Sequence, residues 1–367
     1  FCRSAPRPVM SHTFLRKLAA AGSLLCLALA GTSGLARPVT DHLNRVVDVP
    51  DTVVRVAVAD IFPYASVTCV YLGGCDRLVA MHPTSMAAAQ KGLLGELYPE
   101  VKNVNVSVMR GAEVNLEALM ALKPDVVFVN AGNKRLIERL EAAGLPALAV
   151  STSKWDYNVV QTYAHWIELL DQTFPAQKHS AKALEKARAI EKLVRERTAD
   201  IPHDQKRRVL FLVQYDAKRI VTSGSRFFGE YWASAGGAVN VGHDLTLEKG
   251  SAVINFEQIL AWNPDAVFVT NFTRSSPQDI VQSTWHDWSG VQAVKTGAIY
   301  KMPLGLYRSY TPSGDSPLTL LWMAATLYPE RFADIDLAKE VQSFYQDVYG
   351  IAIGPDKARA LFPAAHK

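Results

Sequence analysis

The stretch Asn115-Leu-Glu-Ala-Leu-Met-Ala-Leu-Lys-Pro-Asp-Val-Val-Phe-Val129 recurs 140 residues further on as Asn255-Phe-Glu-Gln-Ile-Leu-Ala-Trp-Asn-Pro-Asp-Ala-Val-Phe-Val269. The asparagine, glutamate, second alanine, proline, aspartate, valine, phenylalanine and final valine match in register. A repeat of this length inside a chain of 367 residues indicates that one structural unit is used twice.

Each copy predicts a short helix followed by a buried strand. The asparagine stands where a helix N-cap is favoured. Glu117 and Glu257 fall in the first helical turn, where the helix dipole favours negative charge. The Pro-Asp pair ends the helix, and the apolar, β-branched run after it is typical of a strand in a parallel sheet. Two such helix–turn–strand units predict two similar α/β lobes.

The rest of the chain also favours an α/β fold with largely parallel sheets, because short β-branched runs alternate with helical patterns. Outside the repeats we expect strands over 53–59, 78–81, 147–150, 209–214, 220–222 and 299–302. The C-terminal part is expected to be helical over 318–327 and 337–348.

The segment between the two copies predicts a long helical connection over 159–198. Apolar residues recur there at helical spacing, and charged residues are spaced to pair across one turn. Pro175 is expected to start or kink the second part of this helix. We therefore divide the chain into a leader (1–36), a first lobe (37–156), a connecting backbone helix (157–200) and a second lobe (201–367).

The first 36 residues have the pattern of an export signal. Basic residues precede an apolar run from Leu18 to Ala30, and small residues follow up to Ala36, where a signal peptidase would cut. The run is too short to cross a membrane as a helix. A lipoprotein signal at Cys26 is the alternative, although a leucine precedes it where a small residue is usual. We expect a periplasmic protein.

The charge balance depends on this leader. Four of the 39 Lys and Arg residues lie in it and no acidic residue does, so 35 basic residues remain against 35 acidic ones. A mature protein close to neutral gives no indication of a nucleic-acid partner or of binding to an anionic membrane surface.

Cys69 and Cys75 are the two cysteines that follow the leader. In an oxidising compartment this close pair can form a disulfide. The alternative is two buried thiols on either side of the Gly73-Gly74 turn, and the sequence leaves both interpretations open.

The two repeats, the connecting helix and the segment L-L-W-M-A-A-T-L-Y-P-E-R-F-A-D-I-D (320–336) resemble the helical-backbone, or class III, substrate-binding proteins of ABC importers. That family includes binders of ferric siderophores, haem, cobalamin and some metal or oxyanion species. The resemblance covers nearly all of the mature chain. It implies two Rossmann-like α/β lobes joined by one long backbone helix, a ligand cleft between the lobes, a monomer, and delivery of the ligand to a permease in the inner membrane.

In this family one surface glutamate of each lobe docks on arginines of the permease. Glu117 and Glu257 match those positions, because each follows its capping asparagine by two residues. Two like charges on rigid helix starts are suited to orienting a complex. The alternative is that each glutamate only offsets its helix dipole.

Ligands of α/β lobes bind outside the carboxyl ends of the strands, so residues there are the candidate ligand contacts. Aromatic rings beside guanidinium groups suit a bulky, anionic, partly apolar ligand such as a ferric chelate. In the first lobe the candidates are Phe62, Tyr64, Met81, His82, Arg110, Asn130, Asn133 and Trp155. In the second lobe they are Tyr215, Arg226, Phe227, Asn271, Phe272, Arg274, Tyr307, Arg308 and Tyr310.

The ligand expected first is an iron(III)–siderophore or a similar metal chelate. Haem, cobalamin, a nickel or cobalt chelate and a molybdate-like oxyanion remain alternatives, and Met81-His82 could contact haem iron. The scattered histidines show no metal-ligand spacing, so we expect no protein-held metal and no cofactor apart from a metal that arrives with the ligand. A secreted α/β enzyme is a rival class, but no Gly-x-Ser-x-Gly elbow or phosphate loop is present. A ligand sensor is a third.

Overall fold

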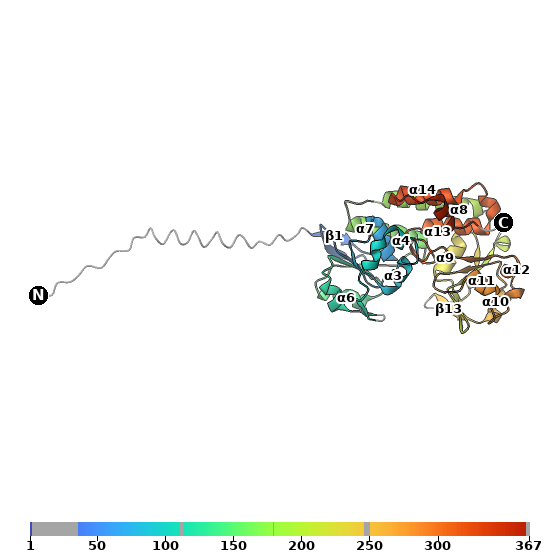
Figure 1. Cartoon of the computed structure of the whole chain (residues 1–367), viewed down its shortest axis with the longest axis horizontal. Helices are drawn as coiled ribbons and strands as arrows, with labels where there is room; N and C mark the ends of the chain where they lie inside the picture. The colour runs from blue at the N-terminus through green and yellow to red at the C-terminus, as the bar shows by residue number, and fades with distance from the viewer. Residues whose placement is uncertain (2–35, 111–112, 179, 246–249, 365–367) are drawn as a thin grey trace.

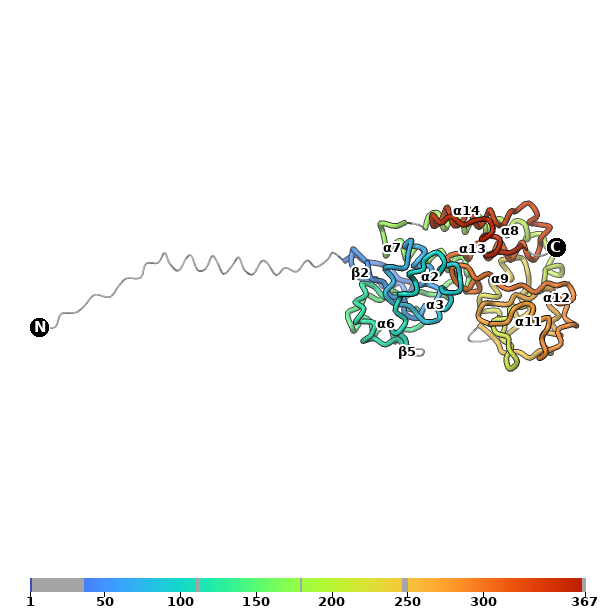
Figure 2. Tube along the Cα trace, in the orientation of Figure 1, coloured from blue at the N-terminus to red at the C-terminus, as the bar shows by residue number. Residues whose placement is uncertain are grey.

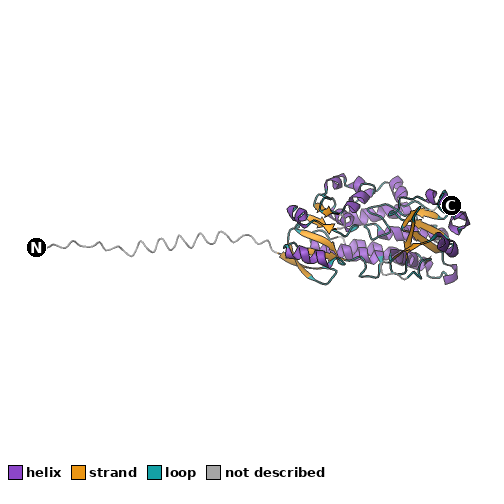
Figure 3. Cartoon of the chain, turned by 90° about the horizontal axis from the view of Figure 1, so that it is seen from below, coloured by secondary structure: helices purple, strands orange, loops and turns teal. Residues whose placement is uncertain are grey.

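The computed structural model describes residues 1, 36–110, 113–178, 180–245 and 250–364. Two lobes lie side by side, and helices run along one side of both (Figure 1). The strands gather in two groups, one toward each end of this body (Figure 3). Apart from its first and last residues, the expected leader lies outside the described residues, and the lipidation alternative at Cys26 lies there with it.

The first lobe is built on a four-stranded parallel sheet. Its order is β4 (Leu78–Ala80), β3 (Val56–Val58), β7 (Val126–Asn130) and β8 (Ala147–Val150). Strands β3 and β8 are buried along their whole length, as expected for a parallel sheet covered by helices on both faces.

The second lobe repeats this arrangement with β12 (Val239–Asn240), β9 (Arg208–Leu212), β14 (Ala266–Val269) and β15 (Ile299–Lys301). Strand β14 occupies the same position in its sheet as β7 does in the first sheet. Each lies between the strands that come first and last along the chain in that sheet, β9 and β15 or β3 and β8. The predicted α/β class with two similar lobes is therefore confirmed.

The helices that cover the sheets are short. Those of the first lobe are α2 (Tyr64–Leu72), α3 (Pro83–Ala89), α4 (Leu93–Leu97), α5 (Leu116–Ala121) and α6 (Lys134–Ala142). Those of the second lobe are α9 (Phe228–Ala235), α10 (Phe256–Trp262), α11 (Pro277–Val281), α12 (Gln292–Lys295), α13 (Ser316–Leu327), α14 (Leu337–Tyr349) and α15 (Pro355–Leu361). No helix in the described ranges has the length and apolar character to cross a membrane.

Three antiparallel sheets complete the fold, and the sequence patterns did not indicate them as sheets. Their strands are β1 (Ala36–Thr40) with β2 (Val46–Pro50), β5 (Met109–Arg110) with β6 (Glu113–Val114), and β10 (Gln214–Asp216) with β11 (Arg219–Ser223) and β13 (Ser251–Ile254).

The repeated unit has the construction that its residues predict. The side chain of Asn115 accepts a hydrogen bond from the Ala118 N–H at 3.2 Å, and Asn255 caps α10 through the Gln258 N–H at 2.9 Å. Leu119 and Ile259 are completely buried beneath the two helices. The two copies are therefore matched in their caps and in their packing as well as in sequence.

The connection between the lobes differs from the single long helix that we predicted. It consists of α7 (Val159–Thr173) and α8 (Ser180–Thr198). The two helices pack against each other and are joined by a short connection, so the chain reverses direction between them. Helix α7 ends before Pro175 because a proline disfavours helical geometry in the residue before it.

Helix α8 provides the rigid link that the resemblance implied. It has 19 residues, a length of about 28 Å at 1.5 Å per residue. Its apolar side, with Ala183, Ala187, Ile190 and Val194, is buried. Helices α8 and α14 run together along the top of both lobes, and the tube view follows α8 as it returns from the end of α7 (Figure 2).

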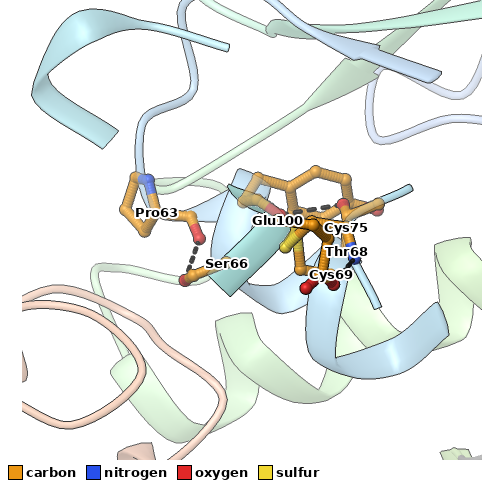
Figure 4. The surroundings of a disulfide bond; sticks show 7 residues. Pro63, Ser66, Thr68, Cys69, Cys75 and Glu100 are labelled. Atoms are coloured by element: carbon orange, nitrogen blue, oxygen red, sulfur yellow. Dashed lines mark hydrogen bonds between the residues drawn. A yellow bond between two sulfur atoms is a disulfide. The ribbon is translucent and has the colours of Figure 1, made fainter. Parts of the chain in front are cut away.

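Cys69 and Cys75 form a disulfide, which decides between the two alternatives left open by the sequence. The bond joins the last turn of α2 to the residue after the Gly73-Gly74 turn, and both cysteines are buried (Figure 4). The Cys75 N–H also donates to the Glu100 carboxylate at 3.2 Å. The pair therefore braces the interior of the first lobe.

The lobes touch at a close backbone contact. The Leu93 N–H at the start of α4 donates to the Gly305 carbonyl of the second lobe at 2.9 Å. A Cβ atom on Gly92 would lie 2.7 Å from that carbonyl oxygen, and one on Gly305 would overlap the Asp315 carboxylate. Glycine at 92 therefore allows the two lobes to approach so closely, and glycine at 305 allows its loop to pass against Asp315 of the same lobe.

Gly92→Ala should lower the free energy of unfolding by about 1–3 kcal/mol, because backbone atoms cannot yield to the added methyl group without moving the lobes apart. Urea denaturation followed by circular dichroism measures the change. Gly354→Ala is the matched control, since its Cβ would meet nothing within 4 Å; it should stay within about 0.5 kcal/mol of the original protein. Equal effects of the two changes would contradict the lobe contact.

Candidate functional site

The loop after β15 presents an arginine without an acidic partner. The Arg308 Cζ lies 4.8 Å from the ring centroid of Phe272 and 5.9 Å from that of Tyr307. Arg308 is half-buried, and it forms no ion pair with any carboxylate in the described ranges. Aromatic faces stabilise the cation without using its N–H donors, so these donors remain available to an anion.

Two polar atoms beside this arginine are buried and unpaired. The Tyr307 hydroxyl and the Asn271 Oδ1 have no hydrogen-bond partner among the residues described. Burial raises the pKa of Tyr307 to about 12, so the hydroxyl keeps its proton and remains a donor. Buried polar groups are nearly always satisfied in folded proteins; a ligand oxygen can satisfy the Tyr307 donor, whereas the Asn271 Oδ1 is an acceptor and requires a donor.

Lys301 fixes the loop that carries Phe272. Its Nζ donates to the carbonyls of Thr270 at 2.9 Å, Thr273 at 3.1 Å and Ser275 at 2.7 Å. Burial lowers the pKa of Lys301 to about 8, with the charge of Asp279 opposing that shift. The Lys301 ammonium group therefore holds three backbone carbonyls of the 270–275 loop, which carries Phe272.

Asp315 fixes the loop that carries Arg308. Its completely buried carboxylate accepts from the Leu306 N–H at 3.0 Å, from the Ser313 hydroxyl at 2.5 Å and from the Tyr345 hydroxyl at 3.0 Å. Burial raises the pKa of Asp315, and these donors act in the opposite direction. The carboxylate therefore joins both ends of the 306–313 loop to helix α14.

On the first lobe, His82 lies at the carboxyl end of β4 and caps α3. Its Nδ1 accepts from the Thr84 N–H at 3.0 Å, and its ring lies against Phe62 at 4.0 Å between centroids. A neutral imidazole whose Nδ1 accepts carries its proton on Nε2. Burial lowers the pKa of His82, which favours this neutral form, while Asp60 opposes the shift. The His82 ring is therefore a hydrogen-bond donor at Nε2.

The neighbouring Met81 is buried in the core and is not a surface ligand.

Asp60 organises the neighbouring strand ends of the first lobe. It follows β3 and accepts from the Asn130 N–H and from the Asn133 side-chain amide, both at 2.7 Å. Asn130 uses its Oδ1 to accept from the Gly132 N–H at 2.8 Å. Asn130 and Asn133 thus lie together at the expected edge, with their side chains used largely to shape it.

Aromatic rings connect the two lobes near the candidate loops. Tyr157, which follows β8, lies 5.5 Å from Phe227 and 5.3 Å from Phe228 between ring centroids. Phe228 in turn lies 6.0 Å from Tyr310. Tyr157 and its neighbour Asp156 both adopt left-handed backbone conformations, with φ of 58° and 49°. Such conformations are costly for residues other than glycine and are found preferentially at functional sites.

Three predicted ligand residues are engaged in ring packing within the first or second lobe; two of them are buried and Trp155 is partly exposed. Tyr64 is completely buried between Phe128 and Trp166. Tyr215 is 1% exposed, and its hydroxyl bonds to Ser283, His286 and Trp288. Trp155 stacks on His165 at 4.1 Å and packs edge-on against His42. These rings are occupied by contacts within their lobes, which a sequence pattern does not indicate.

Tyr310 is also buried, 1% exposed, with its hydroxyl accepting from the Gly229 N–H at 3.1 Å, whereas two predicted arginines remain on the surface. Arg226 and Arg274 are exposed, Arg226 directly before Phe227 and Arg274 in the loop that Lys301 holds. The side chain of Arg110 lies outside the described part of the chain. Sequence reasoning missed Asp60, Lys301 and Asp315. For Asp60 and Lys301 the sequence offers a weak signal, because each is a charged residue at the end of an apolar strand. For Asp315 the sequence offers no signal.

A cavity of about 580 Å³ lies between α8 and α9, away from the strand ends. It is lined by Glu191, Arg195 and Tyr231, and the Tyr231 hydroxyl donates to Glu191 at 3.3 Å. The opposite charges of Glu191 and Arg195 in its lining offset each other. We therefore assign the ligand to the strand-end loops rather than to this cavity. Within the described ranges, no three His, Cys, Asp or Glu side chains gather as a metal-ligand set.

Two α/β lobes tied by a helical strut, with donors at their strand ends, define a substrate-binding protein of an ABC importer rather than an enzyme. The sequence matches the family described as periplasmic binding protein over residues 72–304. The chain therefore belongs to this family.

Similar proteins cover most of the chain. The molybdate-binding protein MolA of Haemophilus influenzae is 28% identical over 349 residues, which are 88% of this chain and 93% of MolA. The structure of MolA bound to molybdate superposes with a TM-score of 0.73 at 25% identity, covering 87% of this chain and 99% of MolA. A periplasmic solute-binding protein from Veillonella parvula superposes with a TM-score of 0.79 at 25% identity. The superposition covers 89% of this chain and 97% of the Veillonella protein.

A further relative matches about half of the chain. The Fe(3+)-citrate-binding protein YfmC of Bacillus subtilis is 24% identical over 198 residues, which are 53% of this chain and 58% of YfmC.

The His82 ring should be neutral and protonated on Nε2 at pH 7, because the Thr84 N–H occupies Nδ1 and burial lowers the imidazole pKa. Long-range ¹H–¹⁵N correlation spectra of the imidazole nitrogens measure the tautomer. His82→Gln assigns the signals by their disappearance, and exposed His203 supplies reference signals. A proton found on Nδ1 would contradict the assigned donor.

Proposed function

We propose that this chain is exported to the periplasm, captures an anionic, oxygen-rich ligand that contains a metal, and delivers it as a monomer to the permease of its importer. A molybdate-type oxyanion is the ligand that the site suits best. The metal enters as part of the cargo, and the protein contributes donors to oxygen atoms rather than metal ligands.

The observation that carries this proposal is the state of Arg308. A half-buried guanidinium held against Phe272 and Tyr307 is partly removed from water. A charge in such surroundings is costly to keep unpaired. An anion with several oxygens compensates the charge and accepts more than one of its N–H groups.

Other donors extend the same chemistry. The Tyr307 hydroxyl and the His82 Nε2–H both donate, and neither has a partner among the residues described. An oxyanion offers only acceptors, so neutral and cationic donors suit it and carboxylates do not. The 28% identity to a protein that binds molybdate supports this choice.

An anionic ferric chelate is the second candidate, in keeping with the iron–siderophore that we expected first from the sequence. The Phe272 ring favours it, because 38% of this large apolar side chain is exposed beside Arg308. An exposed ring can cover the carbon atoms of a chelator while the arginine pairs with its carboxylates. The similarity to the Fe(3+)-citrate-binding protein points the same way.

Glu117 and Glu257 are proposed to dock on the permease. Both are exposed in the first turn of their helices, behind matched asparagine caps. Strand β5, whose partner β6 leads into α5, lies at the lower edge of the first lobe, and α10 lies in the lower part of the second (Figures 1 and 2). β5 and α10 therefore lie on the side away from α8 and α14, a side that a single membrane partner can cover.

Arg308→Ala should weaken molybdate binding about 30-fold or more, because removing one partner of a partly desolvated charge pair costs at least about 2 kcal/mol. Isothermal titration calorimetry with molybdate, ferric citrate and sulfate measures the affinities. Arg139→Ala removes an exposed arginine from the last turn of α6, at the end away from Asn133, and should leave them unchanged. Unaltered molybdate affinity in Arg308→Ala would contradict the assigned site, and tighter binding of ferric citrate than of molybdate would favour the second candidate.

Glu117→Ala combined with Glu257→Ala should abolish ligand uptake by cells while leaving the Kd for the same ligand within about twofold, since both acids are exposed and neither is among the donors assigned to the ligand. Uptake of molybdate into cells and calorimetry on the purified protein give the two readings. Loss of affinity, or full uptake with both acids removed, would refute docking through these residues.

A further inference from the structure

Helices α5 and α10 each expose an apolar side chain one turn after the glutamate. Met120 follows Glu117 by three residues and is 43% exposed, and Leu260 follows Glu257 by three residues and is 45% exposed. Side chains at i and i+3 lie on the same helix face. Each lobe therefore presents one acid and one long apolar group side by side.

The repeat makes these two surfaces equivalent. Met120 and Leu260 are separated by the same 140 residues as the rest of the unit, and the residues before them, Leu119 and Ile259, are both completely buried. The burial of one position sets the rotation of each helix on its sheet, so the next residue faces solvent in both lobes.

The ends of the two helices are matched as well. Lys123 and Asn263, again 140 residues apart, both adopt left-handed conformations, with φ of 47° and 44°. The backbone thus leaves each helix in the same direction and does not cover the apolar side chain. An isolated exposed leucine or methionine is ordinary, but two at equivalent positions beside equivalent acids form a paired surface.

We infer that Met120 and Leu260 are the apolar anchors of the permease contact, each beside its docking glutamate. The inference rests on the proposed docking of Glu117 and Glu257 and extends it. The partner is a membrane protein with two equivalent basic pockets, each bordered by apolar side chains. Contact with an anchor excludes water from the neighbouring ion pair, which strengthens the electrostatic attraction.

The test uses the complete mature protein and the cognate permease–ATPase complex in lipid nanodiscs. Biolayer interferometry measures the Kd between them, without ligand and with molybdate added as a probe. Met120→Ser combined with Leu260→Ser should weaken this Kd about tenfold or more, in line with the loss of two buried apolar side chains. Met120→Leu should bind like the original protein, because a leucine supplies a similar apolar surface.

The matched control is Val281→Ser, which removes an exposed apolar side chain of α11 outside the repeated units. It should leave the Kd unchanged, and an equal loss in this control would overturn the inference. If the serine pair binds normally while Glu117→Ala with Glu257→Ala binds weakly, the apolar anchors are wrong and glutamate docking stands. If neither pair weakens binding, docking through this side fails and the inference falls with it.

Discussion

The buried carboxylate of Asp315 is the interaction on which the ligand-binding edge depends. It joins the two ends of the loop that carries Arg308 and anchors that loop to α14 through Tyr345. Gly305 passes directly against the carboxylate and offers its carbonyl to Leu93 of the first lobe. The Asp315 carboxylate therefore fixes the shape of the 306–313 loop and its attachment to α14. Through Gly305 it also supports the point at which the lobes meet. A preorganised loop lowers the entropic cost of binding.

The duplication explains why the two halves of the molecule act as a matched pair. Each copy buries one apolar residue under its short helix and places a glutamate beside a capped helix start, so equivalent surfaces follow from equivalent packing. The halves differ at their strand ends. The first lobe contributes His82 and the loop organised by Asp60, whereas the second contributes Arg308 on the loop fixed by Asp315 and Phe272 on the loop held by Lys301. The surface proposed for docking is therefore equivalent in the two lobes, whereas the site proposed for the ligand differs between them.

The sequence predicted the fold well because the decisive signals are local. The Asn115 cap, the helical spacing and the β-branched strand all lie within one repeat, and its recurrence implies the second lobe. The break of the connection near Pro175 was expected, but the reversal of direction between α7 and α8 was not, because apolar periodicity continues across the proline. Tyr64 and Tyr215 were misplaced because position after a strand does not determine which way a side chain points. Lys301 was missed because its partners are backbone carbonyls about 30 residues away in the chain.

The paired glycines at the lobe contact have a mechanical consequence. With Gly92 and Gly305 in contact, the separation of the lobes at that point is set by the thickness of one peptide group and cannot decrease. The lobes can therefore separate at this point but cannot approach further, so a smaller cargo has to be met by movement of the strand-end loops rather than by a closer approach here.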